Sequence, residues 1–240
     1  MIEIIKKNQQ AYGEFNNGEI VENKPIGFPL EGGTLKPYSN IFYWAHAKAS
    51  VDSVIGLHPH KGFEIISIVL KKGIKHYDTL VKKWIDLKKG DVQIIQSGSG
   101  ISHSEAINKD AAIFQIWLDP NLEKSLSQPA TYKDYSEEEF FAIGNKKVLI
   151  GEGSPLEVKT EGIEMFELNL KETFTMKCNK ENYYSFYVLS GNPTINNNSV
   201  EQDDFIRIKH EQELIINPKG ETKLFCIISP TDVSYPTYAG

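Results

Sequence analysis

Residues 90–118 read GDVQIIQSGSGISHSEAINKDAAIFQIWL, and this stretch decides the fold. Its two apolar runs, Val92–Gln96 and Ala112–Leu118, are rich in β-branched and aromatic residues and are typical of β-strands. The glycines at 98–100 predict a turn between them, because glycine adopts backbone conformations that other residues avoid. We therefore expect a β-sheet in which short strands follow one another through tight turns.

The same alternation of strand and turn extends over the rest of the chain. Turn residues such as Gly191–Pro193 and Pro218–Gly220 separate the strand segments. Helical periodicity is scarce, and its best candidate is Ser136–Ala142, where Ser136 and Glu139 would form a capping box. This spacing predicts an all-β protein built as a sandwich or barrel. The further expected strands are Ile41–Ala47, Phe63–Leu70, Tyr183–Leu189, Phe205–Ile208, Glu213–Ile216 and Lys223–Ile228.

A weak internal repeat divides the chain into two halves, which we interpret as two β-barrels in tandem. We expect an N-terminal barrel at 1–120, a polar connector at 121–146 and a C-terminal barrel at 147–240. The two should share one interface and unfold together, because a small barrel alone has exposed edges and a limited core. The first-half segments VLKKG (69–73), GDVQI (90–94) and IFQIWLDP (113–120) recur in order as VLSG (188–191), DDFIR (203–207) and LFCIISP (224–230).

The composition is that of a globular protein and disfavours a nucleic-acid binder. The chain has 240 residues, of which 40% are hydrophobic and 24% charged, and a formal net charge of −6. Nucleic-acid binders usually present a basic face rich in arginine, whereas this chain has 25 lysines and a single arginine, Arg207. We therefore expect no direct nucleic-acid partner.

The chain's first residues and its cysteines predict a cytoplasmic protein that does not engage a membrane. The start, MIEIIKKNQQ, lacks the apolar core of a secretory signal, and no apolar run is long enough for a transmembrane helix. Without a secretion signal, Cys178 and Cys226 are expected to remain reduced thiols rather than to form a disulfide.

The sharpest chemical feature is the pair His58-Pro59-His60. Side chains at positions i and i+2 of a strand face the same side, with Cα atoms roughly 6.5–7 Å apart, so both imidazoles can point into a barrel and share one metal ion. Glu64 has the same parity and would face inward as well, provided that the strand continues unbroken.

A second pair of the same spacing, His103-Ser104-Glu105, lies farther along the chain. Neighbouring antiparallel strands would bring it beside the first pair, giving three neutral imidazoles and one carboxylate. That donor set suits Fe(II), and also Mn, Co, Ni, Cu or Zn. It would leave coordination positions open for water, dioxygen or substrate on a six-coordinate metal.

Two groups of motifs resemble a known family. GLHPHKGFE at 56–64, followed by Gly73, resembles the first cupin motif. GDVQ at 90–93 and GSGISHSE at 98–105, with HYD at 76–78 and QIW at 115–117, resemble specifically the pirin family of bicupins. The close match covers about residues 40–120. One departure is Ser99, where pirins commonly carry arginine.

The resemblance implies two cupin (jelly-roll-type) barrels with one divalent transition metal, most simply Fe(II), in the N-terminal barrel. It assigns His58, His60, His103 and Glu105 as metal ligands. In general cupins the first-motif glutamate, here Glu64, is the ligand; following the pirin pattern we favour Glu105 and place Glu64 nearby.

Other residues of the first half are predicted to surround this site. His76 is expected at the rim or beside the ligands, with a structural histidine of the barrel as the alternative. Gln115 and Trp117 are in phase on one strand, so both are expected to line the cavity, with a core position for Trp117 as the alternative. His46 is expected to be structural.

The second half lacks a comparable set of ligands. The repeat puts Lys177 and Asn179 at the positions of His58 and His60. It puts Ile216 and Pro218 at those of His103 and Glu105, and His210 stands alone there. We expect this barrel to be metal-free and structural, or a platform for partners.

The family resemblance implies two classes of function. One is a dioxygenase of the quercetin 2,3-dioxygenase kind, acting with dioxygen on a flavonol or aromatic enol. Glu105 would then be the catalytic base that accepts the proton of the substrate hydroxyl. The alternative is a non-catalytic, metal-dependent regulatory or redox-sensing protein that binds a transcription factor or a metabolic enzyme.

Overall fold

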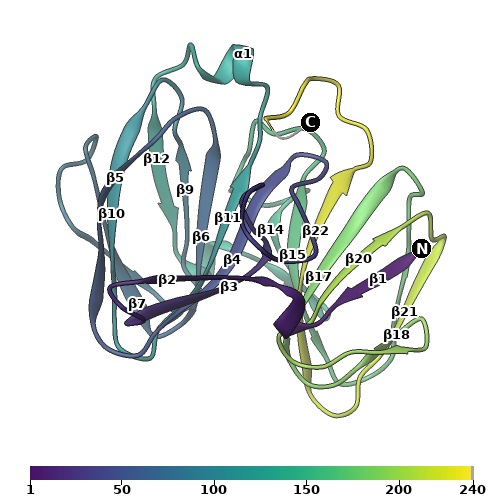
Figure 1. Ribbon diagram of the computed structural model, residues 1–240. Helices are drawn as coiled ribbons and strands as arrows, with labels where there is room; N and C mark the ends of the chain where they lie inside the picture. Colours follow the sequence, from purple (N-terminus) through teal and green to yellow (C-terminus); the bar gives the residue numbers. More distant parts are fainter. Residues whose placement is uncertain (239–240) are drawn as a thin grey trace. The chain divides into compact units, whose positions relative to one another are not determined.

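The computed structural model describes residues 1–238, which fall into two compact units (Figure 1). The first unit comprises Gln10–Glu138 with residues 235–238, and the second comprises Met1–Gln9 and Glu139–Ser234. Each unit thus takes a short segment from the opposite end of the chain. The predicted domain boundaries, 1–120, 121–146 and 147–240, and the predicted interface between the two barrels stay predictions. Residues 239 and 240 of the predicted C-terminal barrel lie outside the described residues.

The first unit contains a seven-stranded and a four-stranded sheet. The larger has the order β12-β9-β6-β11-β4-β3-β2, the smaller β5-β10-β7-β8, and the neighbouring strands are antiparallel. The larger comprises β2 (Ala11–Phe15), β3 (Ile20–Ile26), β4 (Ile41–Ala49), β6 (Glu64–Lys71), β9 (Val92–Gln96), β11 (Ala112–Leu118) and β12 (Thr131–Tyr135). The smaller comprises β5 (Ser53–His60), β7 (Gly73–Asp78), β8 (Ile85–Lys88) and β10 (Ile101–Ile107).

The second unit repeats this arrangement. Its sheets have the orders β1-β20-β17-β22-β15-β14-β13 and β16-β21-β18-β19. The larger comprises β1 (Ile2–Ile5), β13 (Ala142–Ile143), β14 (Lys146–Ile150), β15 (Glu164–Leu170), β17 (Asn182–Ser190), β20 (Phe205–Lys209) and β22 (Thr222–Pro230). The smaller comprises β16 (Phe174–Lys177), β18 (Thr194–Ile195), β19 (Asn198–Ser199) and β21 (Glu213–Asn217).

The two units agree with the repeat found in the sequence. The repeated segments form β6, β9 and β11 in one unit and β17, β20 and β22 in the other, and each set occupies the same places in its seven-stranded sheet. The prediction of an all-β chain is confirmed. Central strands such as β6 and β11 are apolar almost throughout because both of their faces are buried.

The predicted helix at Ser136–Ala142 is wrong. Only Glu137–Glu139 forms a 3₁₀ helix (η2), and Ala142 already begins β13. The described α-helix is instead α1 (Leu122–Ser125), a single turn capped by Asn121, whose side chain accepts from the Lys124 N–H. A second 3₁₀ turn, η1, covers Lys7–Gln9.

Buried aliphatic and aromatic side chains fill the interior of each unit. In the second unit, the core includes Phe186, Ile206, Leu224 and Cys226. Both cysteines are free thiols, and burial raises the pKa of Cys178 to about 11. Within residues 1–238, no helix is long and apolar enough to cross a lipid bilayer.

Asp119, directly after β11, anchors residues 235–238 to the first unit. Its carboxylate accepts from the Tyr238 backbone N–H, and its carbonyl accepts from the Tyr235 hydroxyl at 3.0 Å. The other carboxylate oxygen, Oδ1, is buried without a hydrogen-bond partner. Burial raises the pKa of Asp119 to about 6, although the Tyr238 N–H opposes this shift.

Asp119→Asn is expected to stabilise the protein above pH 7 by about 1–3 kcal/mol and to change its stability little below pH 4. A carboxyl whose pKa is raised by folding contributes stability at low pH that is lost as pH rises through about 6. The amide avoids that loss and can still accept the Tyr238 N–H. Thermal unfolding at both pH values, with the 77% exposed Asp86 changed to Asn as control, measures the difference. A shift of equal size at both pH values would contradict it.

Candidate metal centre

Two neighbouring strands of the small sheet in the first unit position three histidines. His58 and His60 lie two residues apart on β5, which is an edge strand. Pro59 between them lacks a backbone N–H, and an edge strand tolerates this because it pairs on one side only. β10 runs antiparallel beside β5 and sets His103 directly opposite His58.

The ring nitrogens of these histidines converge on one point. The Nε2 atom of His103 lies 2.8 Å from Nε2 of His60 and 2.9 Å from Nε2 of His58. The three ring centroids are 4.5–4.7 Å apart. Among the described residues, this is the one cluster of His, Cys, Asp or Glu side chains with the spacing of a metal site.

The protonation state of the cluster fits a cation. His58 Nδ1 lies 2.7 Å from the Gly56 carbonyl oxygen, which can only accept, so Nδ1 donates to it and Nε2 faces the cluster. Burial, with the neighbouring histidines, lowers the pKa of both His60 and His103 to about 3. Neutral imidazole nitrogens packed this closely are the donors that a divalent transition metal takes.

Glu105 lies beside the cluster but not within it. Its side chain is fully buried, and its two oxygens accept from the Ser67 hydroxyl at 3.1 Å and from the Gln115 amide at 2.7 Å. β5 contains one extra residue opposite the step from His103 to Glu105, whereas β10 itself pairs regularly with β7 through both residues. The role of Glu105 as fourth ligand and base stays a prediction.

Glu64 occupies a different strand from the first two histidines. The condition of an unbroken strand from His58 is not met, because β5 ends at His60 and β6 begins at Glu64. Glu64 is nevertheless buried, and its Oε1 accepts from the Gln96 amide at 2.8 Å. It lies outside the histidine cluster, and its predicted place near the metal stays a prediction.

His76 belongs to a separate buried group behind His103. Its Nε2 lies 2.7 Å from Asp78 Oδ2, and its ring stacks on Tyr132 at 4.6 Å. Gln93 lies 3.3 Å from His76 Nδ1, and the His103 ring is 5.7 Å away. Asp78 belongs to the HYD motif noted in the sequence, but no role was predicted for it, although its two-residue spacing from His76 repeats the pattern used for the ligands. Nothing in the sequence pointed to Tyr132.

Trp117 forms the wall next to the cluster. Its ring meets His60 edge-on at 4.8 Å, while Gln115, two residues earlier on β11, reaches Glu105. Four further rings surround Trp117 at 5.3–6.3 Å, and the strand pattern alone gave no sign that they gather here. They are Phe28, Phe42, Tyr43 and Phe63.

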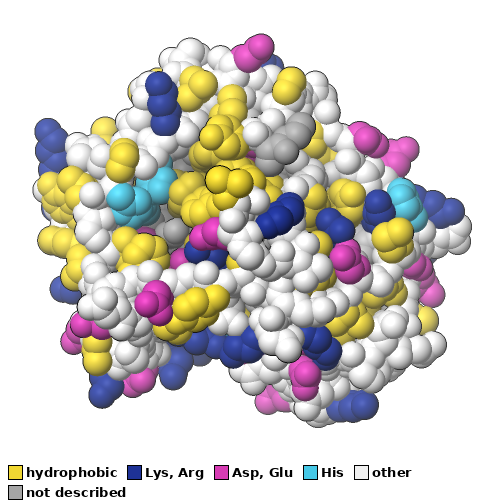
Figure 2. Space-filling view, in the orientation of Figure 1, with side chains coloured by type: hydrophobic (Ala, Val, Ile, Leu, Met, Phe, Trp, Pro, Cys, Tyr) yellow, Lys and Arg dark blue, Asp and Glu magenta, His cyan; other side chains and the backbone are white. Residues whose placement is uncertain are grey.

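The cluster reaches the protein surface. His58 is half-buried, and a hollow of about 470 Å³ lies next to His60, lined among others by Lys61, Thr79 and Ser102. In Figure 2, histidine side chains at the left of the view border a hydrophobic area. His46, expected to be structural, is buried and packs edge-on against Phe114 at 5.2 Å.

In the second unit, β16 and β21 occupy the sheet positions of β5 and β10. Lys177 lies exposed at the end of β16, and Ile216 is buried on β21. His210 lies outside both strands, with its Nδ1 3.2 Å from the Lys180 carbonyl oxygen. The expectation that this unit holds no metal stays a prediction.

Comparison with known proteins relates this arrangement to one family. Residues 34–118 match the family model described as Pirin. A quercetin 2,3-dioxygenase from Escherichia coli (strain K12) is 26% identical over 182 residues, covering 73% of this chain and 76% of that protein. A Zymomonas mobilis protein, provisionally named a quercetin 2,3-dioxygenase, is 38% identical over 81 residues; the alignment covers 32% of this chain and 34% of that protein.

The solved structures share the fold. The crystal structure of the bacterial pirin YhhW from Escherichia coli, in complex with nickel(II), superposes with a TM-score of 0.81 at 23% identity. The superposition covers 97% of this chain and 100% of that one. The predicted tandem cupin fold is thereby confirmed.

The protein is expected to bind about one divalent transition metal per chain, through the three-histidine cluster. Elemental analysis after reconstitution with Fe(II) or Ni(II) measures the ratio. His103→Ala should abolish retention on a desalting column, whereas His210→Ala in the second unit should not affect it. A ratio near two, or near zero after reconstitution, would overturn this assignment.

If Glu105 is the fourth ligand, Glu105→Gln is expected to weaken metal binding by about 10-fold or more, because a neutral amide replaces the carboxylate. Glu64→Gln should have a smaller effect on affinity, since it changes chiefly the hydrogen bond with Gln96. Competition with a chromophoric chelator gives both dissociation constants. A loss of affinity confined to Glu64→Gln would reverse the roles of the two glutamates.

Proposed function

Because the chain belongs to the pirin family, we propose that it is a metal-dependent dioxygenase that opens a flavonol or a related aromatic enol. The observation that carries this proposal is the convergence of three imidazoles beside a wall of aromatic side chains. The Escherichia coli relative named quercetin 2,3-dioxygenase supports the substrate class.

The donor set supports Fe(II) as the metal. His58, His60 and His103 would hold it, with Glu105 as the fourth ligand, and this combination of nitrogen and oxygen donors suits first-row divalent ions. When bound, the metal supplies Lewis-acid activation of the enol hydroxyl and electron exchange with dioxygen. The Nδ1–H of His58 donates to the Gly56 carbonyl oxygen, and this hydrogen bond would orient Nε2 toward the ion.

Glu105 would act as the base. The enol hydroxyl gives its proton to a carboxylate oxygen of Glu105, and the enolate that results is the electron-rich species able to react with dioxygen. Ser67 and Gln115 donate to the two oxygens of Glu105 and orient its carboxylate. Burial of these groups excludes water from the proton transfer.

The aromatic wall would position the substrate. Trp117 lies against His60, and Phe63 lies against Trp117, so flat rings can pack beside the metal ligands. Apolar surface with a few convergent polar groups is what a small aromatic ligand requires.

A second candidate function is a metal-dependent regulatory or redox-sensing protein that binds another protein. Its support is the exposed Val54 and Leu57 on the edge strand β5, next to His58, because edge strands with apolar side chains favour protein contacts. The same metal centre would then control a binding surface.

Protein loaded with Fe(II) is expected to consume about one dioxygen per flavonol converted, since both oxygen atoms enter the product. An oxygen electrode with a panel of flavonols, with and without a chelator, measures this. His103→Ala is the negative control, and metal-free protein should be equally inactive. Absence of uptake by fully metal-loaded protein would reject the enzyme and favour the regulatory candidate.

A further inference from the structure

An aromatic platform continues outward from the metal centre. Phe42 on β4 and Phe63, between β5 and β6, stack at 4.6 Å with an interplanar angle of 25°. Both contact Trp117, at 6.3 Å and 5.7 Å, and Trp117 meets His60 at 4.8 Å. A continuous series of ring contacts therefore leads from a predicted ligand to the platform.

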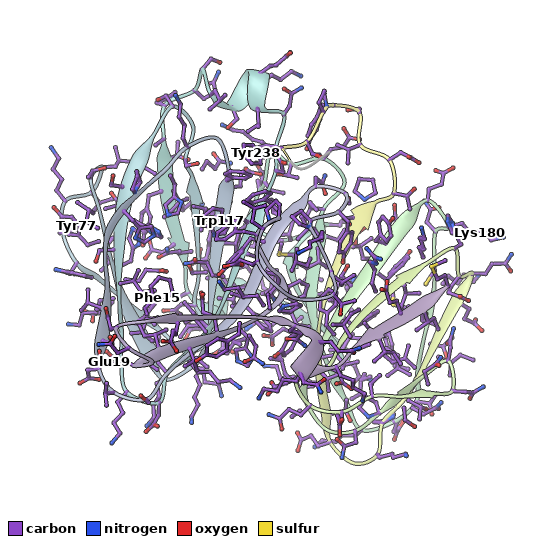
Figure 3. All side chains as sticks on the ribbon, in the orientation of Figure 1. Phe15, Glu19, Tyr77, Trp117, Lys180 and Tyr238 are labelled. Atoms are coloured by element: carbon purple, nitrogen blue, oxygen red, sulfur yellow. The ribbon has the colours of Figure 1, made fainter. Side chains whose placement is uncertain are left out.

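The ring of Tyr238 covers this platform. It meets Phe42 at 5.2 Å and Phe63 at 5.6 Å, in both cases edge-on. With Tyr238 in place, Phe42 is 5% exposed and Phe63 is 9% exposed, whereas Tyr238 itself is 64% exposed. Figure 3 shows Trp117 and Tyr238 at the same end of the first unit. The chain thus places an aromatic ring of its own on an aromatic surface.

The attachment of this ring allows it to leave. The segment is anchored through its backbone and through Tyr235, both of which bond to Asp119. The Tyr238 side chain adds the two edge-on ring contacts, and such pairs contribute only about 0.5–1.5 kcal/mol each. Rotation of one exposed side chain would uncover the platform without detaching the segment from Asp119.

We propose that Tyr238 is a displaceable cap on an aromatic subsite, and that the outer ring of a planar polycyclic ligand takes its place on Phe42 and Phe63. The ligand's hydroxyl end then lies at the histidine cluster, with Trp117 along its length. This rests on the proposed function for the ligand class and goes beyond it in assigning a size-selecting residue. A ligand with one ring at the metal is too short to reach Tyr238.

The test compares two chelating aromatic probes on Ni(II)-loaded protein, where binding is measured without turnover. Quercetin has an outer ring and catechol does not. Tyr238→Ala is expected to strengthen quercetin binding about 3- to 10-fold, because the ligand no longer displaces a ring, and to leave catechol binding within about 2-fold. Tyr238→Phe keeps the cap and should match the unmodified protein for both probes.

Tyr12→Ala removes an equally exposed tyrosine of the same unit and serves as the matched control. Unchanged or weaker quercetin binding by Tyr238→Ala, or an equal change for both probes, overturns the cap. Failure of either probe to bind overturns it as well. This experiment measures binding and not oxygen uptake. If Tyr238→Ala strengthens quercetin binding and leaves catechol binding unchanged, but the protein does not oxidise quercetin, the subsite is supported and only the dioxygenase proposal is rejected.

Discussion

The antiparallel register of β5 on β10 is the constraint on which the metal centre depends. It sets His103 opposite His58 and Ile101 opposite His60. A slip of one residue would turn the imidazoles of one strand to the other face of the sheet, away from their partners. β10 is also paired with β7 on its other side, which fixes its position between two neighbours. The edge strand β5 can then carry Pro59 between two histidines without losing its register.

Burial lowers the pKa of two of the histidines and makes hydrogen-bond donors necessary for the carboxylate of Glu105. The same desolvation that keeps His60 and His103 neutral would be costly for Glu105 if its carboxylate lacked donors. Ser67 from β6 and Gln115 from β11 meet this demand from the opposite sheet. The histidines and the carboxylate thus lie on one sheet and the groups that orient the carboxylate on the other, which ties the site to the packing of the whole unit.

Most of what could be predicted from the sequence came from the spacing of residues along single strands and from the order of repeated segments. The two-residue intervals within His58–His60 and His103–Glu105 follow from strand geometry, and the repeated segments foretold two units of the same topology. Contacts between segments far apart in the sequence left no such signature, so the roles of Ser67 and Tyr238 could not be predicted. The position of Glu64 relative to His58 and His60 could not be predicted for a related reason. Alternation of side chains holds only within one strand, and the chain passes from β5 in one sheet to β6 in the other between His60 and Glu64.

The exchange of end segments between the units has a consequence for how the chain folds. β1 (Ile2–Ile5) pairs with β20 (Phe205–Lys209), so most of the described chain separates the two partners in the sequence. The edge of β1 therefore lacks its native partner until β20 has been made, by which time residues 10–138 already supply every described strand of their own unit. Pairing over so long a stretch of chain closes a large loop and is slow. The unit with the histidine cluster can form its sheets as soon as residues 10–138 are made, whereas the other unit cannot be completed before β20 is made.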